Sequence, residues 1–200
     1  MPLNDQISNA ADFTSDAGFN RLYSLSIQAL AEKHWTPLHV VKKAVNFLAA
    51  ENNVRILDIG SGAGKFCLAA AHFKPNAFYY GIEQRKKLVS DADTTKQMLK
   101  LVNVSFINGN FTQLDFKNYD HFYFFNSFYE NLTNTHKIDE SIAYSEELYD
   151  YYNRYLYKQL DRKCAGTRLV TYHSMEYEVP ARYHVVGADE ESLLKYWIKV

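Results

Sequence analysis

Three glycines that alternate with small residues, directly after a short apolar run, constrain the fold of this chain more than any other stretch. The run spans residues 54–57 and leads into Asp58. β-Branched residues bounded by glycines predict a buried strand. Gly60, Gly62 and Gly64 then allow a sharp turn, and they leave bare backbone against which a ligand can lie.

The residues that follow continue a β–α–β pattern. Residues 66–73 have a helical pattern, and Pro75 stops the helix. A second apolar run over residues 77–82 predicts another strand, which ends in Glu83. A glycine loop at the strand–helix turn and an acid at the tip of the second strand are typical of a nucleoside-binding site.

Spacing separates three glycine-loop chemistries. A P-loop requires four residues between its glycines and then Lys and Ser or Thr. Here only three residues separate Gly60 from Gly64, and Phe66 follows Lys65. The dinucleotide fingerprint requires a glycine where Lys65 stands. The pattern that remains is D-x-G-x-G-x-G, with an acid at the end of the next strand.

This combination, LDIGSGAGKF followed by GIE, resembles the first two motifs of the class I (seven-strand) S-adenosylmethionine-dependent methyltransferases. The resemblance implies that Asp58 and the glycine loop hold the methionine end of the cofactor and that Glu83 accepts both ribose hydroxyls. A turn that binds nothing is the alternative. The implied cofactor-binding residues are Asp58, Gly60, Ser61, Gly62, Gly64, Phe66, Glu83, Gln84, Asn110, Phe111 and Asn126.

Asn110 departs from the usual family pattern. After a strand predicted over residues 104–107, the family usually carries an Asp whose side chain bonds the adenine amino group. The carbonyl oxygen of Asn110 can still make this bond, with Phe111 packed on the ring. The alternative is an asparagine that only shapes a turn.

The end of the strand predicted over residues 121–125 is also informative. Amino-methylating families carry [DN]-P-P-[YFW] there. Asn126 and Tyr129 keep the outer members of this pattern, but Ser127 and Phe128 replace both prolines, which disfavours a nucleobase or glutamine methyltransferase. The segment is also similar to that of seven-strand lysine methyltransferases, as is HWTPLHVV before the first strand. Alternatively, Asn126 caps the next helix.

The predicted catalytic residues are Asn126, Tyr129 and Glu130. Methyl transfer from a sulfonium requires mainly that the acceptor lone pair is aligned and water excluded. A basic amine must first lose a proton, to solvent or to a nearby acid such as Glu130. His173, at the end of a strand predicted over residues 167–172, is a further candidate base. No metal-ligand cluster is visible in the sequence, which disfavours the magnesium-dependent catechol type.

The resemblance implies a three-layer α/β/α sandwich around a seven-stranded, mostly parallel sheet with an antiparallel last strand. A chain of 200 residues predicts one compact domain overall. Within it we expect a helical lid segment over residues 1–50 and the methyltransferase domain over residues 51–200. The remaining predicted elements are helices over residues 18–32, 38–50, 84–101 and 140–163 and strands over residues 178–186 and 193–200.

Two aromatic features carry open alternatives. Trp35 and Thr36, between the first two predicted helices, can line the cofactor pocket, or Trp35 can simply pack the helices together. The helix predicted over residues 140–163 is rich in tyrosine, and such a stripe favours packing over recognition.

Composition restricts the partners. A net charge of −1 argues against a protein built to cover nucleic acid, and no apolar stretch is long enough to span a membrane. Cys67 and Cys164 lie far apart, so we expect two buried thiols in a reducing compartment. Because the first residues lack a signal-peptide pattern, we expect a soluble, cytoplasmic protein. The oligomeric state stays open.

We therefore expect a methyltransferase that uses S-adenosyl-L-methionine to modify an amine nitrogen, with a protein lysine as the best single acceptor. A small-molecule O- or N-methyltransferase is the alternative, since the compact chain suits it equally well. A noncatalytic cofactor-binding protein or complex subunit is the third possibility.

Overall fold

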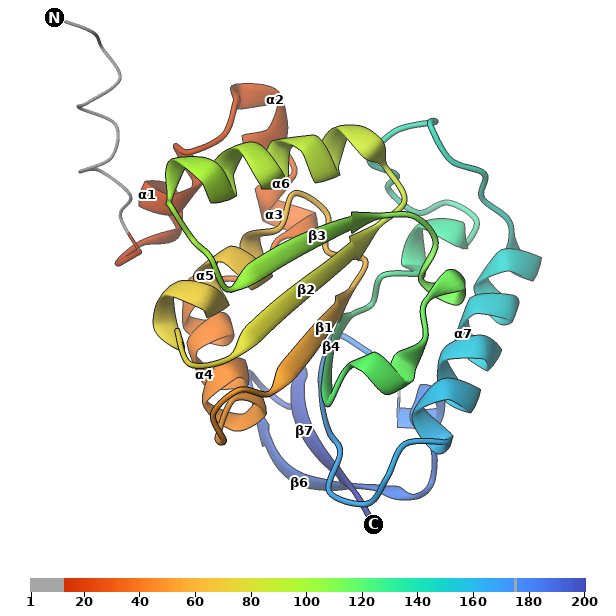
Figure 1. Cartoon of the computed structure of the whole chain (residues 1–200). Helices are drawn as coiled ribbons and strands as arrows, with labels where there is room; N and C mark the ends of the chain where they lie inside the picture. The colour runs from red at the N-terminus through yellow and green to blue at the C-terminus, as the bar shows by residue number, and fades with distance from the viewer. Residues whose placement is uncertain (1–12, 175) are drawn as a thin grey trace, which may run out of the picture.

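A seven-stranded sheet forms the centre of the computed structural model, which describes residues 13–174 and 176–200 (Figure 1). The strand order is β3-β2-β1-β4-β5-β7-β6, and only β7 runs antiparallel to its neighbours. The predicted fold class is therefore confirmed. The strands are β1 (Arg55–Ile59), β2 (Phe78–Glu83), β3 (Val104–Asn108), β4 (His121–Phe125), β5 (Arg168–Tyr172), β6 (Tyr183–Asp189) and β7 (Leu194–Lys199).

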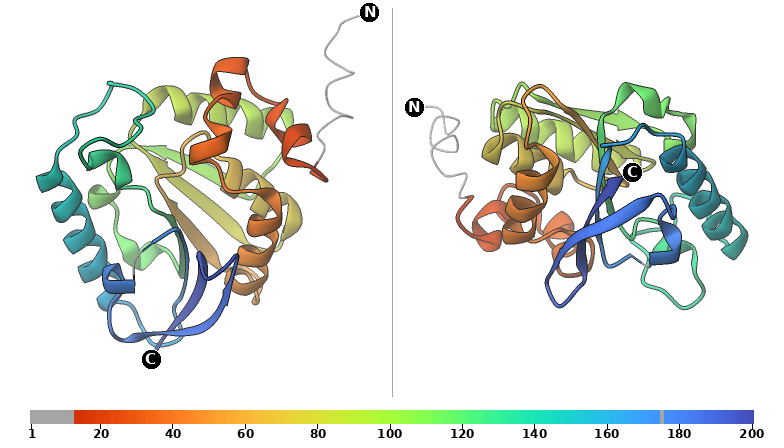
Figure 2. Two further views of the ribbon diagram at one scale, coloured as in Figure 1. Left: turned by 180° about the vertical axis from the view of Figure 1, so that it is seen from behind. Right: turned by 90° about the horizontal axis from the view of Figure 1, so that it is seen from below.

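Helices cover both faces of this sheet (Figure 2). One face carries α4 (Leu38–Leu48), α5 (Lys65–Phe73) and α6 (Lys86–Met98). The other carries α7 (Glu146–Asp161) and the short 3₁₀ helices η2 (Phe111–Gln113), η3 (Phe116–Asn118), η4 (Tyr129–Asn131) and η5 (Glu176–Glu178).

The central strands are apolar on both faces because both faces are covered. In β4, Phe122 and Phe124 point into the core beneath α7, whereas Tyr123 points into the core beneath α4 and α5. All three side chains are buried. A continuous apolar run is thus divided between two cores by the strand period of two.

The N-terminal segment differs from the single helix predicted over residues 18–32. It forms three short helices, α1 (Asp16–Asn20), α2 (Leu25–Gln28) and α3 (Ala31–His34). Ser15 caps α1 by accepting a bond from the Gly18 amide, and Ser24 precedes α2 in an extended conformation. The prediction of helical structure is therefore correct in part, because turns at residues 21–22 and 29–30 divide the segment into three helices.

Two further boundaries correct the sequence-based prediction. α7 begins at Glu146 rather than Glu140, because the Ser145 hydroxyl caps it by accepting from the Leu148 amide. β6 begins at Tyr183 rather than Glu178, since η5 and Pro180 precede it. A bulge between Val185 and Gly187 interrupts its pairing with β7.

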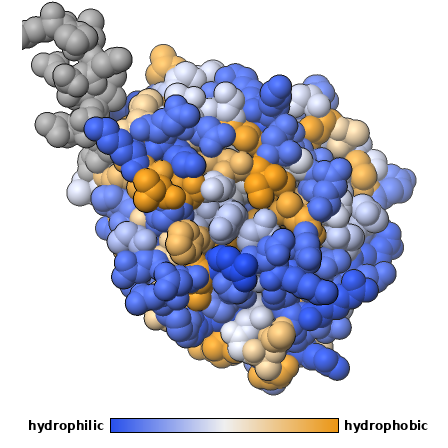
Figure 3. Space-filling model, viewed as in Figure 1, coloured by the Kyte–Doolittle hydropathy of each residue, from blue (hydrophilic) through white to orange (hydrophobic). Residues whose placement is uncertain are grey.

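The surface shows no dominant apolar region on the face seen in Figure 1, where hydrophilic side chains surround smaller apolar areas (Figure 3). Among the described residues, no helix is both long enough and apolar enough to cross a bilayer. Cys67 is buried, as expected, but Cys164 is exposed because it follows α7 in the turn before β5.

Candidate functional site

A cavity of about 360 Å³ opens where the carboxyl ends of β1, β2 and β4 meet. β1 lies between β2 and β4, so the chain order reverses direction across the sheet at this point, where open α/β sheets bind ligands. Most predicted site residues line the cavity. They are Asp58, Gly60, Ser61, Gly62, Phe66, Glu83, Asn126, Tyr129 and Glu130.

The glycine loop is shaped by lack of space at Gly60 and by open space at Gly62. Gly60 has φ +78°, and an added Cβ would lie 2.5 Å from the Ser127 Cβ. Gly62 has φ +53°, and an added Cβ would have no atom within 4 Å. The backbone at Gly62 is therefore open to a ligand. Residue 60 must be a glycine, because a side chain there would overlap Ser127, which follows β4.

Ser61 and Phe66 line the cavity but also support the loop from beneath. An added Cβ at Gly81 of β2 would lie 2.6 Å from the Ser61 hydroxyl oxygen. This oxygen is buried and has no hydrogen-bond partner within the described part of the chain. The Phe66 ring stacks on Tyr123 at 3.7 Å, and the Tyr123 hydroxyl bonds that of Thr36 at 2.8 Å.

Asp58 is 4% exposed at the end of β1. Burial raises the pKa of its carboxyl to about 8, and the nearby Glu83 carboxylate adds to the rise. The Cys67 thiol donates to its Oδ2 over 3.6 Å. No lysine, arginine or histidine in the described residues forms an ion pair with Asp58. A buried carboxyl of this kind suits an ammonium group.

Glu83 is 6% exposed, and both carboxylate oxygens accept hydrogen bonds. Oε2 accepts from the Gly62 amide at 3.2 Å, and Oε1 accepts from the Arg85 amide at 2.9 Å. Burial raises its pKa, although both amides and the Arg85 charge oppose this. Glu83 therefore joins the glycine loop to the segment after β2.

A second, smaller cavity of about 40 Å³ lies beside Glu83. Gln84 and Phe111, both predicted to bind the cofactor, line it together with Phe128 and Tyr152. Phe111 is buried, with its ring 5.0 Å from that of Phe128. This places an apolar surface next to the carboxylate at the end of β2.

Asn110 lies outside both cavity linings, and its side chain is engaged in the protein. Its oxygen accepts from the amide and the hydroxyl of Thr112, which makes it the cap of η2. Its nitrogen donates to Gln84 Oε1 at 3.2 Å and to the Tyr152 hydroxyl at 2.8 Å. These contacts match the turn-shaping alternative, because the oxygen that would meet adenine already has two donors.

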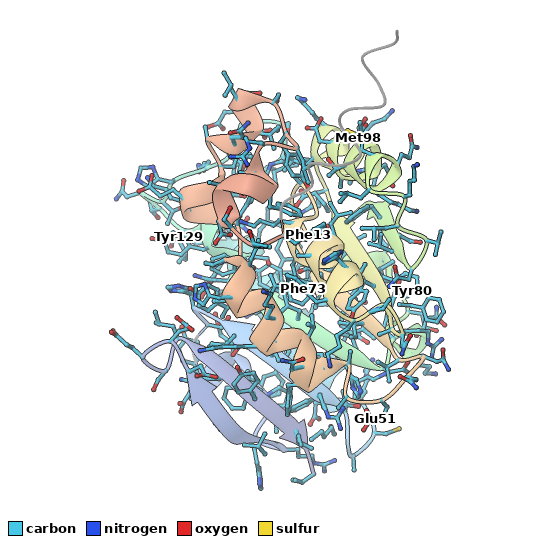
Figure 4. The ribbon with its side chains drawn as sticks, turned by 90° about the vertical axis from the view of Figure 1, so that its left-hand side faces the viewer. Phe13, Glu51, Phe73, Tyr80, Met98 and Tyr129 are labelled. Atoms are coloured by element: carbon cyan, nitrogen blue, oxygen red, sulfur yellow. The ribbon has the colours of Figure 1, made fainter. Side chains whose placement is uncertain are left out.

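Asn126 and Tyr129 line the cavity from the segment that follows β4. Asn126 has φ +40°, an unusual conformation for a residue other than glycine, directly after β4. Among the described residues, its side chain has no hydrogen-bond partner. Tyr129 is 47% exposed and is labelled in Figure 4 below the N-terminal helices, away from Glu51 at the opposite end of the sheet.

Glu130 differs from the free proton acceptor considered above. Its Oε2 accepts from the Arg85 guanidinium at 2.5 Å, and its Oε1 accepts from the Ile138 amide at 2.6 Å. Both oxygens are thus held inside the protein. Arg85 is not among the site residues predicted from the sequence. The signal that could have indicated it is its position two residues after Glu83, the acid predicted to bind the ribose.

The N-terminal helices are fastened to the glycine loop. Lys65 is buried, donates to Asp16 Oδ1 at 2.5 Å and lies over the Trp35 ring at 5.4 Å. The Tyr23 hydroxyl donates to the Ala63 carbonyl at 2.8 Å. Trp35 and Thr36 both line the large cavity. Trp35 also packs 4.9 Å from the Tyr23 ring, so the two alternatives for Trp35 coexist.

His173 and the tyrosines of α7 do not line the large cavity. His173 is exposed after β5 with φ +54° and packs at 4.3 Å from the Tyr172 ring. In α7, the hydroxyl of Tyr155 donates to the Thr112 carbonyl, and that of Tyr149 donates to Glu178. These contacts hold Tyr149 and Tyr155 against neighbouring segments, whereas Tyr151 and Tyr157 are exposed.

The strand order and the glycine loop at the β1–α5 turn define the class I methyltransferase fold. The model of a family described as a methyltransferase domain matches residues 50–186, more than half of the chain. The chain belongs to this methyltransferase-domain family. The family and fold predicted from the sequence are therefore confirmed.

Curated relatives match over shorter stretches. A release factor glutamine methyltransferase of Buchnera aphidicola is 36% identical over 69 residues, which is 34% of this chain and 25% of the relative. A tRNA (guanine-N(7)-)-methyltransferase of a Nostoc species is 30% identical over 84 residues, which is 42% of this chain and 38% of the relative. The matches thus span well under half of these relatives.

Solved structures of similar fold cover most or all of the chain. An RNA methyltransferase from Salinibacter ruber in complex with S-adenosyl-L-homocysteine has a TM-score of 0.54 and 20% identity, and the match covers 82% of this chain and 93% of that one. Magnesium protoporphyrin IX methyltransferase from Synechocystis with bound S-adenosylmethionine has a TM-score of 0.56 and 14% identity. The match covers 100% of this chain and 98% of that one. At these identities the likeness concerns the fold.

Proposed function

We propose that this chain transfers a methyl group from S-adenosylmethionine to an amine nitrogen, with a protein lysine as the best single acceptor. The observation that carries the choice of nitrogen is Asn126, which lines the cavity at the carboxyl end of β4. An amide oxygen at this point can accept a hydrogen bond from an acceptor amine and so orient its lone pair.

The residues present fit the cofactor at three places. Open space beside the Gly62 backbone leaves room for a ligand, and Asp58 offers a buried carboxyl to the methionine ammonium. Glu83 would hold the ribose, and Gln84 and Phe111 would border the adenine. When bound, S-adenosylmethionine supplies an electrophilic methyl group on a sulfonium.

The chain contributes alignment and exclusion of water. The Asn126 amide and the half-exposed Tyr129 ring would hold the acceptor at the cavity mouth. Because both oxygens of Glu130 are already engaged, the amine proton would leave to solvent, and Glu130 would act as a positioning residue. α1–α3, fastened through Lys65, would serve as the lid expected within residues 1–50.

The names of the curated relatives support this choice of acceptor atom. One modifies a ring nitrogen, N7 of guanine, and another modifies a glutamine of a protein, a release factor. They support nitrogen as the acceptor atom and a protein as one acceptor class. Lysine rests on the similarity of the Asn126 segment and of the segment around Trp35 to lysine methyltransferases.

The test combines binding with transfer. We expect calorimetric titration to show micromolar-range binding of S-adenosylhomocysteine that is lost in Glu83→Ala. We also expect Asn126→Gly to lower transfer of labelled methyl to lysate proteins by roughly a hundredfold, with the cofactor affinity unchanged. Glycine adopts a positive φ freely, so this variant removes the side chain without straining the backbone.

The other outcomes separate the alternatives. A labelled small metabolite in place of a protein band would favour the small-molecule methyltransferase. If the wild type binds S-adenosylhomocysteine but labels no acceptor, the noncatalytic subunit is favoured. If NADH or ATP binds and S-adenosylhomocysteine does not, the proposed function is wrong.

A further inference from the structure

Arg85 is a buried cation that contacts both sides of the site. It is 5% exposed and lies two residues after Glu83. Its Nη1 donates to Glu83 Oε1 at 3.4 Å, and its Nη2 donates to Glu130 Oε2 at 2.5 Å. One guanidinium therefore joins the carboxylate at the end of β2 to the segment that follows β4.

The same guanidinium also reaches the loop before α7. Its Nε donates to Asp139 Oδ1 at 3.2 Å, and its Nη2 donates to the Tyr144 hydroxyl at 2.6 Å. Desolvation works against the charge of Arg85, but the carboxylates of Glu130 and Glu83 outweigh it and raise its pKa. Three carboxylates around one cation keep it charged in the interior.

The loop over residues 132–145, which leads into α7 (Figure 1), has no helix or strand, and this cluster is one of its attachments to the rest of the protein. Glu130 Oε1 accepts from the Ile138 amide, and the Tyr144 hydroxyl donates to the Asp139 carbonyl at 2.6 Å. His136 and Ile138 of this loop line the large cavity. The position of one cavity wall thus depends on contacts that lead back to Arg85.

We propose that Arg85 is a positioning residue that couples cofactor binding at Glu83 to ordering of the loop over residues 132–145. The inference rests on the proposed function, because it requires Glu83 to bind the ribose. Ribose hydroxyls bound to Glu83 would hold its carboxylate in one position, and this carboxylate is one of the groups that fixes the Arg85 guanidinium. Arg85 then holds Glu130 and the loop more firmly.

Linkage makes this coupling reciprocal, since a loop that cofactor binding orders must in turn favour cofactor binding. Asp139 tests this direction because it lies outside both cavity linings. Among the described residues, its carboxylate accepts from Arg85 and from Ser141, and of these two only Arg85 lines a cavity. Arginine is required here since its planar fork reaches several partners at once, whereas a lysine offers one point charge.

The experiment is hydrogen exchange of the whole protein with and without S-adenosylhomocysteine, together with calorimetric affinities. In the wild type we expect the ligand to slow exchange across residues 132–145. In Arg85→Lys we expect this protection to disappear and the affinity for S-adenosylhomocysteine to fall roughly tenfold. In Asp139→Asn we expect the same affinity to fall roughly threefold. Arg55→Lys, in an ion pair with Asp120 at the amino end of β1, should leave both quantities unchanged.

The outcomes distinguish the two proposals. If the wild type binds S-adenosylhomocysteine but exchange in the loop is the same with and without it, the coupling is wrong and the proposed function stands. Unchanged affinity in both Arg85→Lys and Asp139→Asn would overturn the coupling as well. If the wild type does not bind S-adenosylhomocysteine at all, the proposed function fails and the coupling fails with it.

Discussion

The glycine loop and the segment after β4 face each other across one cavity, but they are held in place by different forces. The glycine loop is fixed by steric limits, as at Gly60, where no side chain fits beside Ser127. The segment after β4 is fixed by charge, through Glu130 and Arg85. Steric limits tolerate almost no substitution, whereas an ion-pair network allows movement between alternative contacts. The glycine loop is thus the more rigid of the two regions, and the segment after β4 the more adaptable.

The largest expected effect comes from adding one methyl group to the rigid side. Gly60→Ala places a Cβ 2.5 Å from that of Ser127 at φ +78°, which should lower the free energy of unfolding by roughly 4 kcal/mol. Gly166→Ala is the matched control, with φ +85° and no atom within 4 Å of the added Cβ. It should cost only about 1 kcal/mol. Urea denaturation measures both, and equal losses would contradict the steric argument.

A smaller loss of stability is expected from a substitution in the segment after β4. Glu130→Gln removes one buried charged partner of Arg85. The Arg85 side chain still has Glu83, Asp139 and Tyr144 as partners. The free energy of unfolding should fall by roughly 2 kcal/mol, less than is usual when a buried ion pair is broken. Glu51→Gln removes the partner of Arg168 from a pair in which Glu51 is 58% exposed, and should cost about 0.5 kcal/mol or less. If both variants lose the same amount, Glu130 has no special role in holding the segment.

The last expected effect is a dependence of cofactor affinity, rather than of stability, on pH. Burial raises the pKa of Asp58 to about 8, so the carboxyl of the free protein is protonated at pH 7. An ammonium group pairs with the ionised form. The affinity for S-adenosylhomocysteine should therefore rise between pH 6 and pH 8, by at most about tenfold per unit. Calorimetry across this range measures it, and Asp58→Asn should flatten the curve. A flat curve in the wild type would place the ammonium elsewhere.

The same group gives the stability of the free protein an opposite trend. The folded state keeps the Asp58 proton up to a pH of about 8, whereas the ordinary pKa of this side chain is 3.8. Between these values the folded state binds more protons than the unfolded chain. The contribution of Asp58 to stability is therefore complete below the lower value and declines as the pH rises through the higher one.

Much of the fold followed from local sequence patterns. The strands β1, β2, β3 and β4 and the helices α4, α5 and α6 lie close to their predicted positions, because buried elements have clear periodicity. The predicted start of α7 was wrong because Ser145 caps the helix six residues later, and the single helix predicted over residues 18–32 was wrong because turns divide it. They were also wrong at β6, where residues 176–178 turn before the strand begins.

The sequence by itself determined the chemistry of the cofactor side. The motif D-x-G-x-G-x-G ends at Gly64, and Glu83 follows only 19 residues later. A β–α–β unit brings the two together by local geometry alone. Only the tertiary structure revealed the contacts of Glu130 and Arg85. The two side chains pair with each other, and Arg85 also pairs with Asp139, so their partners are distant along the chain. A buried polar side chain takes its role from whichever group satisfies it, and folding alone selects that group.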